Sequence, residues 1–241
     1  MIKYRTIGHR GKSGEAPENT MASFRAALDD PAVDVIECDI QLTRDGEVVI
    51  VHDYTVERTS DGRGLVKDHT YRELLQYDFG AWFSPGYRGE RIPLFSDLLK
   101  LVDGRKRIQV EIKDTAGFYP QIGGRLVDII EDYPKHTLMI ESFNHGLVKS
   151  IKEKDPGICT GIIVHDNMTL LMEEVRDTKS DFVSIFFGNV TQQIIDRLTG
   201  SNIELTLWTL NHDWQFDYIK QFNGTFYIAS DYPSVVTRNM G

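Results

Sequence analysis

Two carboxylates near the start of the chain share one face of a predicted β-strand. Glu37 and Asp39 lie two residues apart in the apolar run Val35–Gln41, so both side chains point to the same side. Two unpaired carboxylates on an interior face would be costly. A divalent cation would remove that cost, because oxygen ligands suit Ca²⁺ or Mg²⁺. Pairing with a nearby arginine or lysine is the alternative interpretation.

The same alternation returns later in the chain, in the run Ile108–Lys113. Gln109, Glu111 and Lys113 share one face there, and the isoleucines and valine share the other. Glu111 can supply a third carboxylate to the ion. Lys113 suits an anionic phosphate as a point charge. It is equally suited to neutralise Glu111, and the two roles are compatible.

Two histidines stand where predicted strands end. His9 follows the first strand between Gly8 and Arg10, and His52 ends the apolar run that begins at Val48. Two histidines form a natural acid–base couple near neutral pH. Zinc binding is the competing use, but a carboxylate-rich site favours a hard cation. Arg10 could clamp phosphate oxygens with its planar guanidinium group.

An aromatic residue near the end of a late strand, Trp208, could border a substrate pocket. Ordinary packing in the core explains such a side chain equally well. No dinucleotide-binding or phosphate-loop motif occurs, so a nucleotide cofactor is not expected.

These residues need a scaffold, and the chain alternates short β-rich runs with segments of helical period. The strand candidates are Thr6–His9, Val35–Gln41, Val48–His52, Ile108–Lys113, Thr137–Ser142, Cys159–Val164, Phe182–Phe186, Glu204–Thr209 and Thr225–Ser230. The helical candidates are Asn19–Leu28, Leu94–Val102, Gln121–Glu131, Gly146–Glu153, Leu170–Lys179, Thr191–Leu198 and Trp214–Phe222. About eight strand–helix units predict parallel strands, either in an open doubly wound sheet or, as the length favours, in a (β/α)8 TIM barrel.

One stretch departs from this alternation. Tyr54–Pro93 is rich in Gly, Arg, Asp and Tyr and is too long for an ordinary connection. We therefore expect a small insertion of about 54–93 after the second strand, covering one end of the barrel. The absence of linkers and repeats predicts a single domain over residues 1–241.

Charge and hydropathy limit the possible partners. The net charge is −9, which argues against general binding of nucleic acid or of membrane surfaces. No apolar stretch approaches the roughly 20 residues that span a bilayer, so stable membrane insertion is not expected. Residues 1–11 lack the apolar core of a signal peptide, which favours a cytoplasmic protein. Oligomeric state is not predicted.

Taken in order, these motifs resemble the glycerophosphodiester phosphodiesterase family nearly end to end. The matching runs are His9-Arg10-Gly11, Ala16-Pro17-Glu18-Asn19-Thr20, Glu37-x-Asp39, His52-Asp53, Glu111-x-Lys113, Trp208-Thr209-Leu210-Asn211 and Ser230-Asp231-Tyr232-Pro233. One departure is Thr225–Ser230, where many relatives carry a Gly-Val-Asp-Gly-Ile-type run. It lies in the last strand, away from the candidate metal ligands and histidines.

The resemblance implies a TIM barrel that hydrolyses small glycerophosphodiesters to glycerol 3-phosphate and an alcohol. By position it implies Ca²⁺ or Mg²⁺ on the three carboxylates, and His9 and His52 as the acid–base pair. It also implies phosphate contacts from Arg10 and Lys113, and a glycerol pocket bordered by Trp208. A phospholipase or lysophospholipase D on the same barrel is one alternative, with rim material in Tyr71, Tyr77, Phe79, Trp82, Phe83 and Tyr87. A non-catalytic phosphodiester-binding protein is another, although no candidate catalytic residue is missing.

Overall fold

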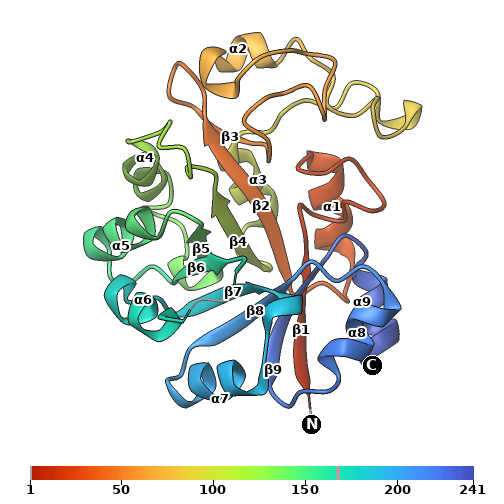
Figure 1. Ribbon diagram of the computed structural model, residues 1–241. Coiled ribbons are helices and arrows are strands. Elements are labelled where there is room, and N and C mark those ends of the chain that lie inside the picture. Colours follow the sequence, from red (N-terminus) through yellow and green to blue (C-terminus); the bar gives the residue numbers. More distant parts are fainter. Residues whose placement is uncertain (1, 167–168) are drawn as a thin grey trace.

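The computed structural model describes residues 2–166 and 169–241, which form a closed barrel of eight parallel strands (Figure 1). The barrel strands are β1 (Lys3–Gly8), β2 (Val35–Leu42), β4 (Arg107–Ile112), β5 (Leu138–Ser142), β6 (Thr160–Val164), β7 (Phe182–Phe186), β8 (Glu204–Trp208) and β9 (Thr225–Ser230). Each pairs in parallel with its neighbours, and pairing of β1 with both β2 and β9 closes the ring. The predicted TIM barrel is confirmed.

Helices surround the barrel and connect successive strands (Figure 1). They are α1 (Met21–Asp29), α3 (Phe95–Val102), α4 (Ile122–Ile129), α5 (His145–Lys154), α6 (Leu171–Thr178), α7 (Gln192–Gly200), α8 (Asp213–Ile219) and α9 (Pro233–Met240). The cap predicted for the first helix is present, since the Thr20 side chain accepts a hydrogen bond from the Ser23 amide. Helix α9 was not predicted; it begins at Pro233, a residue suited to the first turn of a helix.

Strand alternation places the acidic side chains inside the barrel. Ile36, Cys38 and Ile40 of β2 are fully buried in the main core cluster, which also contains Phe24 of α1 and Phe95 of α3. Their neighbours Glu37 and Asp39 therefore face the barrel interior, as the two-residue period predicts. The same division separates the two faces of β4.

One of the predicted strands does not belong to the barrel. Strand β3 (Val48–Ile50) pairs antiparallel with the end of β2, with Ile40 opposite Ile50. The expectation of parallel strands throughout was therefore wrong for this strand. His52 consequently follows an additional hairpin strand, and not a barrel strand.

The segment between β3 and α3 carries a small core of its own and lies at the α2 end of the molecule (Figure 1). It contains the short helix α2 (Tyr71–Leu74), which Thr70 and Glu73 close with a capping box. Its buried residues are Val49, Val51, Val56, Val66, Leu74, Phe79 and Ile92. None of the helices in the described part of the chain is long and apolar enough to cross a membrane.

Candidate active site

His9 is the first residue after β1 and is held by a carboxylate from the other end of the chain. Its amide donates to the Ser230 carbonyl oxygen, and its Nδ1 lies 2.6 Å from Asp231 Oδ1. Asp231 also accepts from the Ser13 hydroxyl at 2.9 Å and from Asn211 Nδ2 at 2.6 Å. Burial alone would raise the pKa of Asp231, but these hydrogen bonds, led by the one with His9, lower it to about 2.

His52 has a similar arrangement built from local residues. Its Nδ1 lies 2.6 Å from Oδ1 of the adjacent Asp53, and Arg58 Nε donates to Asp53 Oδ2 at 2.6 Å. Arg58 in turn pairs with Glu18 at 2.7 Å. Burial opposes the effect of these bonds, yet they lower the pKa of Asp53 to about 2. Burial also lowers the pKa of His52 itself, against the attraction of Asp39.

Both ionised carboxylates determine which imidazole nitrogen carries the proton. A carboxylate can only accept, so each histidine must donate from Nδ1 to its aspartate. The other nitrogen, Nε2, is then free to exchange a proton in the cavity that both His9 and His52 line. Each ring is thereby oriented for proton transfer.

Three carboxylates meet at the carboxyl half of β2 and β4. Glu37, Asp39 and Glu111 each place an oxygen within 4.8 Å of the others. Asp39 is fully buried and Glu37 is 3% exposed, so water can screen their charges only weakly. The sequence prediction that these three acids converge is correct in geometry, although Glu37 and Asp39 lie within β2 and not at its end.

Two cations already neutralise Asp39. Arg10 Nε lies 3.2 Å from Asp39 Oδ2, and Lys113 Nζ lies 3.2 Å from Asp39 Oδ1 and 2.5 Å from Glu111 Oε1. Asn19 Nδ2 adds a hydrogen bond to Oδ2 at 2.8 Å. Ion pairing, the alternative to a metal in the sequence interpretation, is therefore real for this residue. Within residues 2–166 and 169–241, however, Asp39 Oδ1 has no partner with hydrogen-bond geometry.

The three acids differ sharply in their affinity for protons. Burial raises the pKa of Glu37 well above its ordinary value, helped by repulsion from Asp39. Burial likewise raises the pKa of Glu111 to about 7, although Lys113 opposes this. For Asp39, Lys113 and Arg10 outweigh burial and lower the pKa. The cluster is thus short of positive charge around Glu37 and Glu111.

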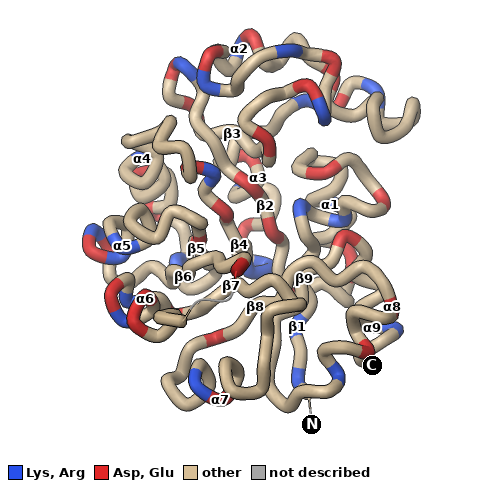
Figure 2. The backbone as a smooth tube through the Cα atoms, in the orientation of Figure 1, with Lys and Arg blue, Asp and Glu red and all other residues tan. Residues whose placement is uncertain are grey.

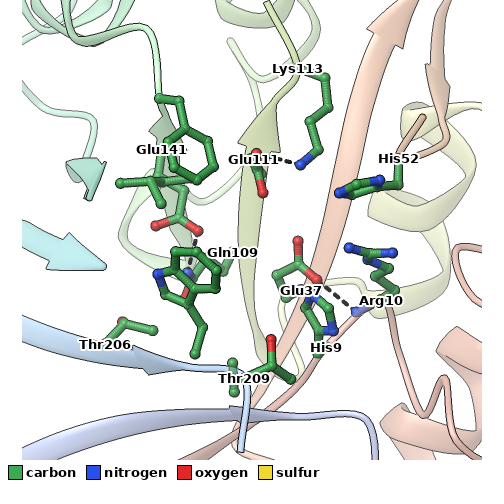
Figure 3. A pocket seen from close by; sticks show the side chains of 14 residues that line it. His9, Arg10, Glu37, His52, Gln109, Glu111, Lys113, Glu141, Thr206 and Thr209 are labelled. Atoms are coloured by element: carbon green, nitrogen blue, oxygen red, sulfur yellow. Dashed lines mark hydrogen bonds and ion pairs between the residues drawn. The ribbon is translucent and has the colours of Figure 1, made fainter. Parts of the chain in front are cut away.

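A cavity of about 220 Å³ joins these groups (Figure 3). Its lining includes all the predicted site residues except Asp39, together with Phe143 and Thr209. Trp208 lies on the wall opposite the histidines and contacts Phe143 edge to face, with ring centroids 6.0 Å apart. The predicted position of Trp208 beside a pocket is thus realised in the structure.

A buried polar group forms part of the cavity wall on the β4–β7 side of the barrel. Gln109 Nε2 donates to Glu141 Oε1 at 2.5 Å, and the Ser184 hydroxyl donates to Glu141 Oε2. Burial raises the pKa of Glu141 to about 8, against the effect of these two hydrogen bonds. Glu141 therefore carries a proton over most of the neutral range.

This buried acid predicts a pH-dependent stability. The folded pKa of Glu141 lies above the unfolded value of about 4.3, so unfolding releases a proton, and rising pH destabilises the fold by about 1.4 kcal/mol per unit between about pH 5 and 8. The neutral, isosteric variant Glu141→Gln should lack this contribution. Urea denaturation at pH 6, 7 and 8 should show a correspondingly shallower slope for the variant. Parallel slopes for the two proteins would contradict the prediction.

Several supporting residues were not assigned roles from the sequence. Asp231 and Asn211 orient His9, Asp53 and Arg58 orient His52, and Glu18 links Arg58 to Arg10. Their positions give partial signals, since Asp53 follows His52 directly and Asp231 follows the last strand. Glu141 carried a similar signal, because it stands in the predicted strand Thr137–Ser142 among apolar residues.

A parallel barrel with two carboxylate-backed histidines and an acidic triad at one cavity defines a hydrolase of phosphoric diesters. The sequence model of the glycerophosphoryl diester phosphodiesterase family matches residues 9–227. The chain belongs to this family, as the motifs indicated, and the predicted enzyme class is confirmed.

Individual relatives agree with the family match. The glycerophosphodiester phosphodiesterase of Caldanaerobacter subterraneus subsp. tengcongensis is 32% identical over 212 residues, covering 87% of each chain. That of Bacillus altitudinis is 31% identical over 232 residues, covering 94% of each. Among solved structures, a phosphodiesterase of Oleispira antarctica in complex with the product sn-glycerol 3-phosphate superimposes with a TM-score of 0.90. It is 27% identical and covers 98% of this chain and 96% of its own.

Proposed function

We propose that this protein hydrolyses glycerophosphodiesters to glycerol 3-phosphate and an alcohol, with His9 and His52 as its acid–base pair and a divalent cation on Glu37, Asp39 and Glu111. The observation that carries the proposal is the meeting of both oriented histidines and the acidic triad at one cavity. A phosphodiester bound there would lie within reach of all of these groups.

The charge of the site supports a divalent cation. Three carboxylates opposed by Arg10 and Lys113 leave one negative charge when all are ionised. The raised pKa values of Glu37 and Glu111 indicate that these carboxyls lack a sufficient positive partner. All the donors are oxygens, which fits Ca²⁺ or Mg²⁺. Such an ion would place positive charge against a non-bridging oxygen of the phosphoryl group.

The chain's own residues would perform the proton transfers. One histidine removes the proton from the attacking oxygen, which is the substrate's 2-hydroxyl (giving a cyclic phosphate) or a water molecule. A new P–O bond forms as the bond to the alcohol breaks, and the other histidine protonates the departing alkoxide. Asp231 and Asp53 stabilise whichever imidazolium forms. Arg10 and Lys113 offer positive charge to the phosphoryl oxygens.

The Oleispira antarctica phosphodiesterase structure contains sn-glycerol 3-phosphate as its product, which supports the glycerol moiety as the retained part of the substrate. The phospholipase alternative has less support, because most aromatic residues of the insertion are not available as a membrane-facing rim. Phe79 is buried, Tyr71 and Tyr77 pack on the insertion core, and Phe83 contacts the rings of Trp82 and Tyr87. Trp82 is the large exposed member, at 41%.

A comparison of substrates tests the proposal. The purified protein with added Ca²⁺ or Mg²⁺ should release glycerol 3-phosphate from glycerophosphocholine and from glycerophosphoethanolamine. Lysophosphatidylcholine should be hydrolysed at least about tenfold more slowly, because one well-placed contact changes discrimination by about this factor. Faster turnover of the lysolipid would favour the phospholipase. Hydrolysis of none of the three, with intact binding, would favour a non-catalytic protein.

A further inference from the structure

Two cavities meet at the proposed catalytic residues. The first is the deep cavity of about 220 Å³ described above, and the second is an open cavity of about 440 Å³. They share His52, Glu111, Lys113 and Phe143. The open cavity is completed by Asp53, Tyr54, Ile112 and Thr115. A phosphodiester has two substituents on one phosphorus, so a phosphoryl group at the shared residues would direct one substituent into each cavity.

The deep cavity is suited to a hydroxylated substituent. Three buried polar atoms on its lining residues, Gln109 Oε1, Thr206 Oγ1 and Trp208 Nε1, have no hydrogen-bond partner among the described residues. Figure 3 shows Gln109 and Thr206 at the side of the pocket away from His52. Buried polar atoms are normally satisfied, and an amide oxygen, a hydroxyl and an indole N–H together match the donors and acceptors of a diol.

The open cavity makes no such demand. The Tyr54 hydroxyl is already hydrogen-bonded to Thr115 Oγ1 at 2.8 Å, and Asp53 is occupied by His52 and Arg58. Ile112 and Phe143 contribute apolar surface. A substituent placed here would therefore be held by contact and shape, which permits chemically different alcohols.

We propose that the leaving alcohol binds in the open cavity, against Tyr54, Thr115 and Phe143, while the glycerol hydroxyls bind Gln109, Thr206 and Trp208 in the deep cavity. The inference rests on the proposed function. It predicts that the open cavity determines which alcohols are accepted, whereas the deep cavity affects every glycerophosphodiester alike.

Thr115 allows the open cavity to be tested without disturbing the catalytic residues. It lies in an exposed turn after β4, so the bulky variant Thr115→Trp should fold and partly fill the cavity. We expect kcat/KM for glycerophosphoinositol to fall about tenfold or more relative to that for glycerophosphoethanolamine. Thr115→Val, which removes the hydrogen bond to Tyr54 without adding bulk, should leave this ratio within about twofold.

Thr206→Val is the matched variant for the deep cavity. It preserves the side-chain shape and removes a hydroxyl that makes no protein hydrogen bond. We expect kcat/KM for both diesters to fall by the same factor, about tenfold, and inhibition by glycerol 3-phosphate to weaken similarly. An unchanged substrate ratio in Thr115→Trp, or a changed ratio in Thr206→Val, would overturn the assignment.

Failure of the proposed function would be distinguishable from failure of this inference. If the wild-type protein hydrolyses neither diester, the proposed activity is wrong. Calorimetric affinities of the same two diesters for wild type, Thr115→Trp and Thr206→Val then carry the comparison. A selective loss of glycerophosphoinositol binding in Thr115→Trp would still support the open cavity as the alcohol site, and an equal loss would refute it.

Discussion

Replacing His9 or His52 by alanine is expected to lower kcat for glycerophosphocholine by about 10²–10⁴-fold, because each loss removes one of the two proton transfers that the reaction requires. Neither side chain supports the core: both line the cavity and each makes its hydrogen bond to an aspartate at the rim of the barrel. The variants should therefore fold normally. Steady-state kinetics and urea denaturation of both variants would check the two expectations together.

The matched control is His136→Ala. His136 is exposed and lies just before β5, at the amino end of the barrel strands and so opposite the cavity. Its removal should leave kcat within about twofold of wild type, as is usual for a surface change away from the site. The double variant of His9 and His52 should lose little more than either single variant, since residues that act as a unit are strongly non-additive. Turnover near the wild-type level in both single variants would sink the acid–base assignment.

The parts of this site that were predictable from the sequence depend on local periodicity. Glu37 and Asp39 share a face because strand side chains alternate, whatever the rest of the fold does. The same rule places Glu111 on the inner face of β4, and parallel pairing then sets Asp39 opposite Glu111. Eight repeated strand–helix units predicted the barrel for a similar reason, because short connections between parallel strands require crossover helices.

What was missed depends on contacts between distant parts of the chain. Asp231 orients His9 across 222 positions, and the link between Glu18 and Arg58 spans 40. No local period marks such partners. The antiparallel pairing of β3 was missed for a related reason, since an apolar run such as Val48–Val51 is equally compatible with either strand direction. Arg10 and Lys113 were expected at phosphate, and their pairing with Asp39 depends on the closed barrel.

Removing divalent cations is expected to have an effect comparable to that of losing a histidine. Dialysis against EDTA should reduce hydrolysis of glycerophosphocholine to background, and Ca²⁺ or Mg²⁺ should restore it. The reason lies in the acidic triad: without an ion, burial keeps Glu37 and Glu111 largely protonated near neutral pH, so the site lacks the charge arrangement that a phosphodiester needs. Full activity after thorough chelation would remove the metal from the proposal.

Stability measurements separate ion binding from catalysis. An ion that binds the folded chain at 100 times its Kd should add about 2.7 kcal/mol to the free energy of unfolding. Glu111→Gln keeps the shape of the side chain but removes one ligand charge, so this gain should largely disappear. Glu131→Gln, an exposed position remote from the triad, should retain it. Because both variants lose one negative charge, a difference between them would assign the effect to the triad and not to net charge, and equal gains would refute the site.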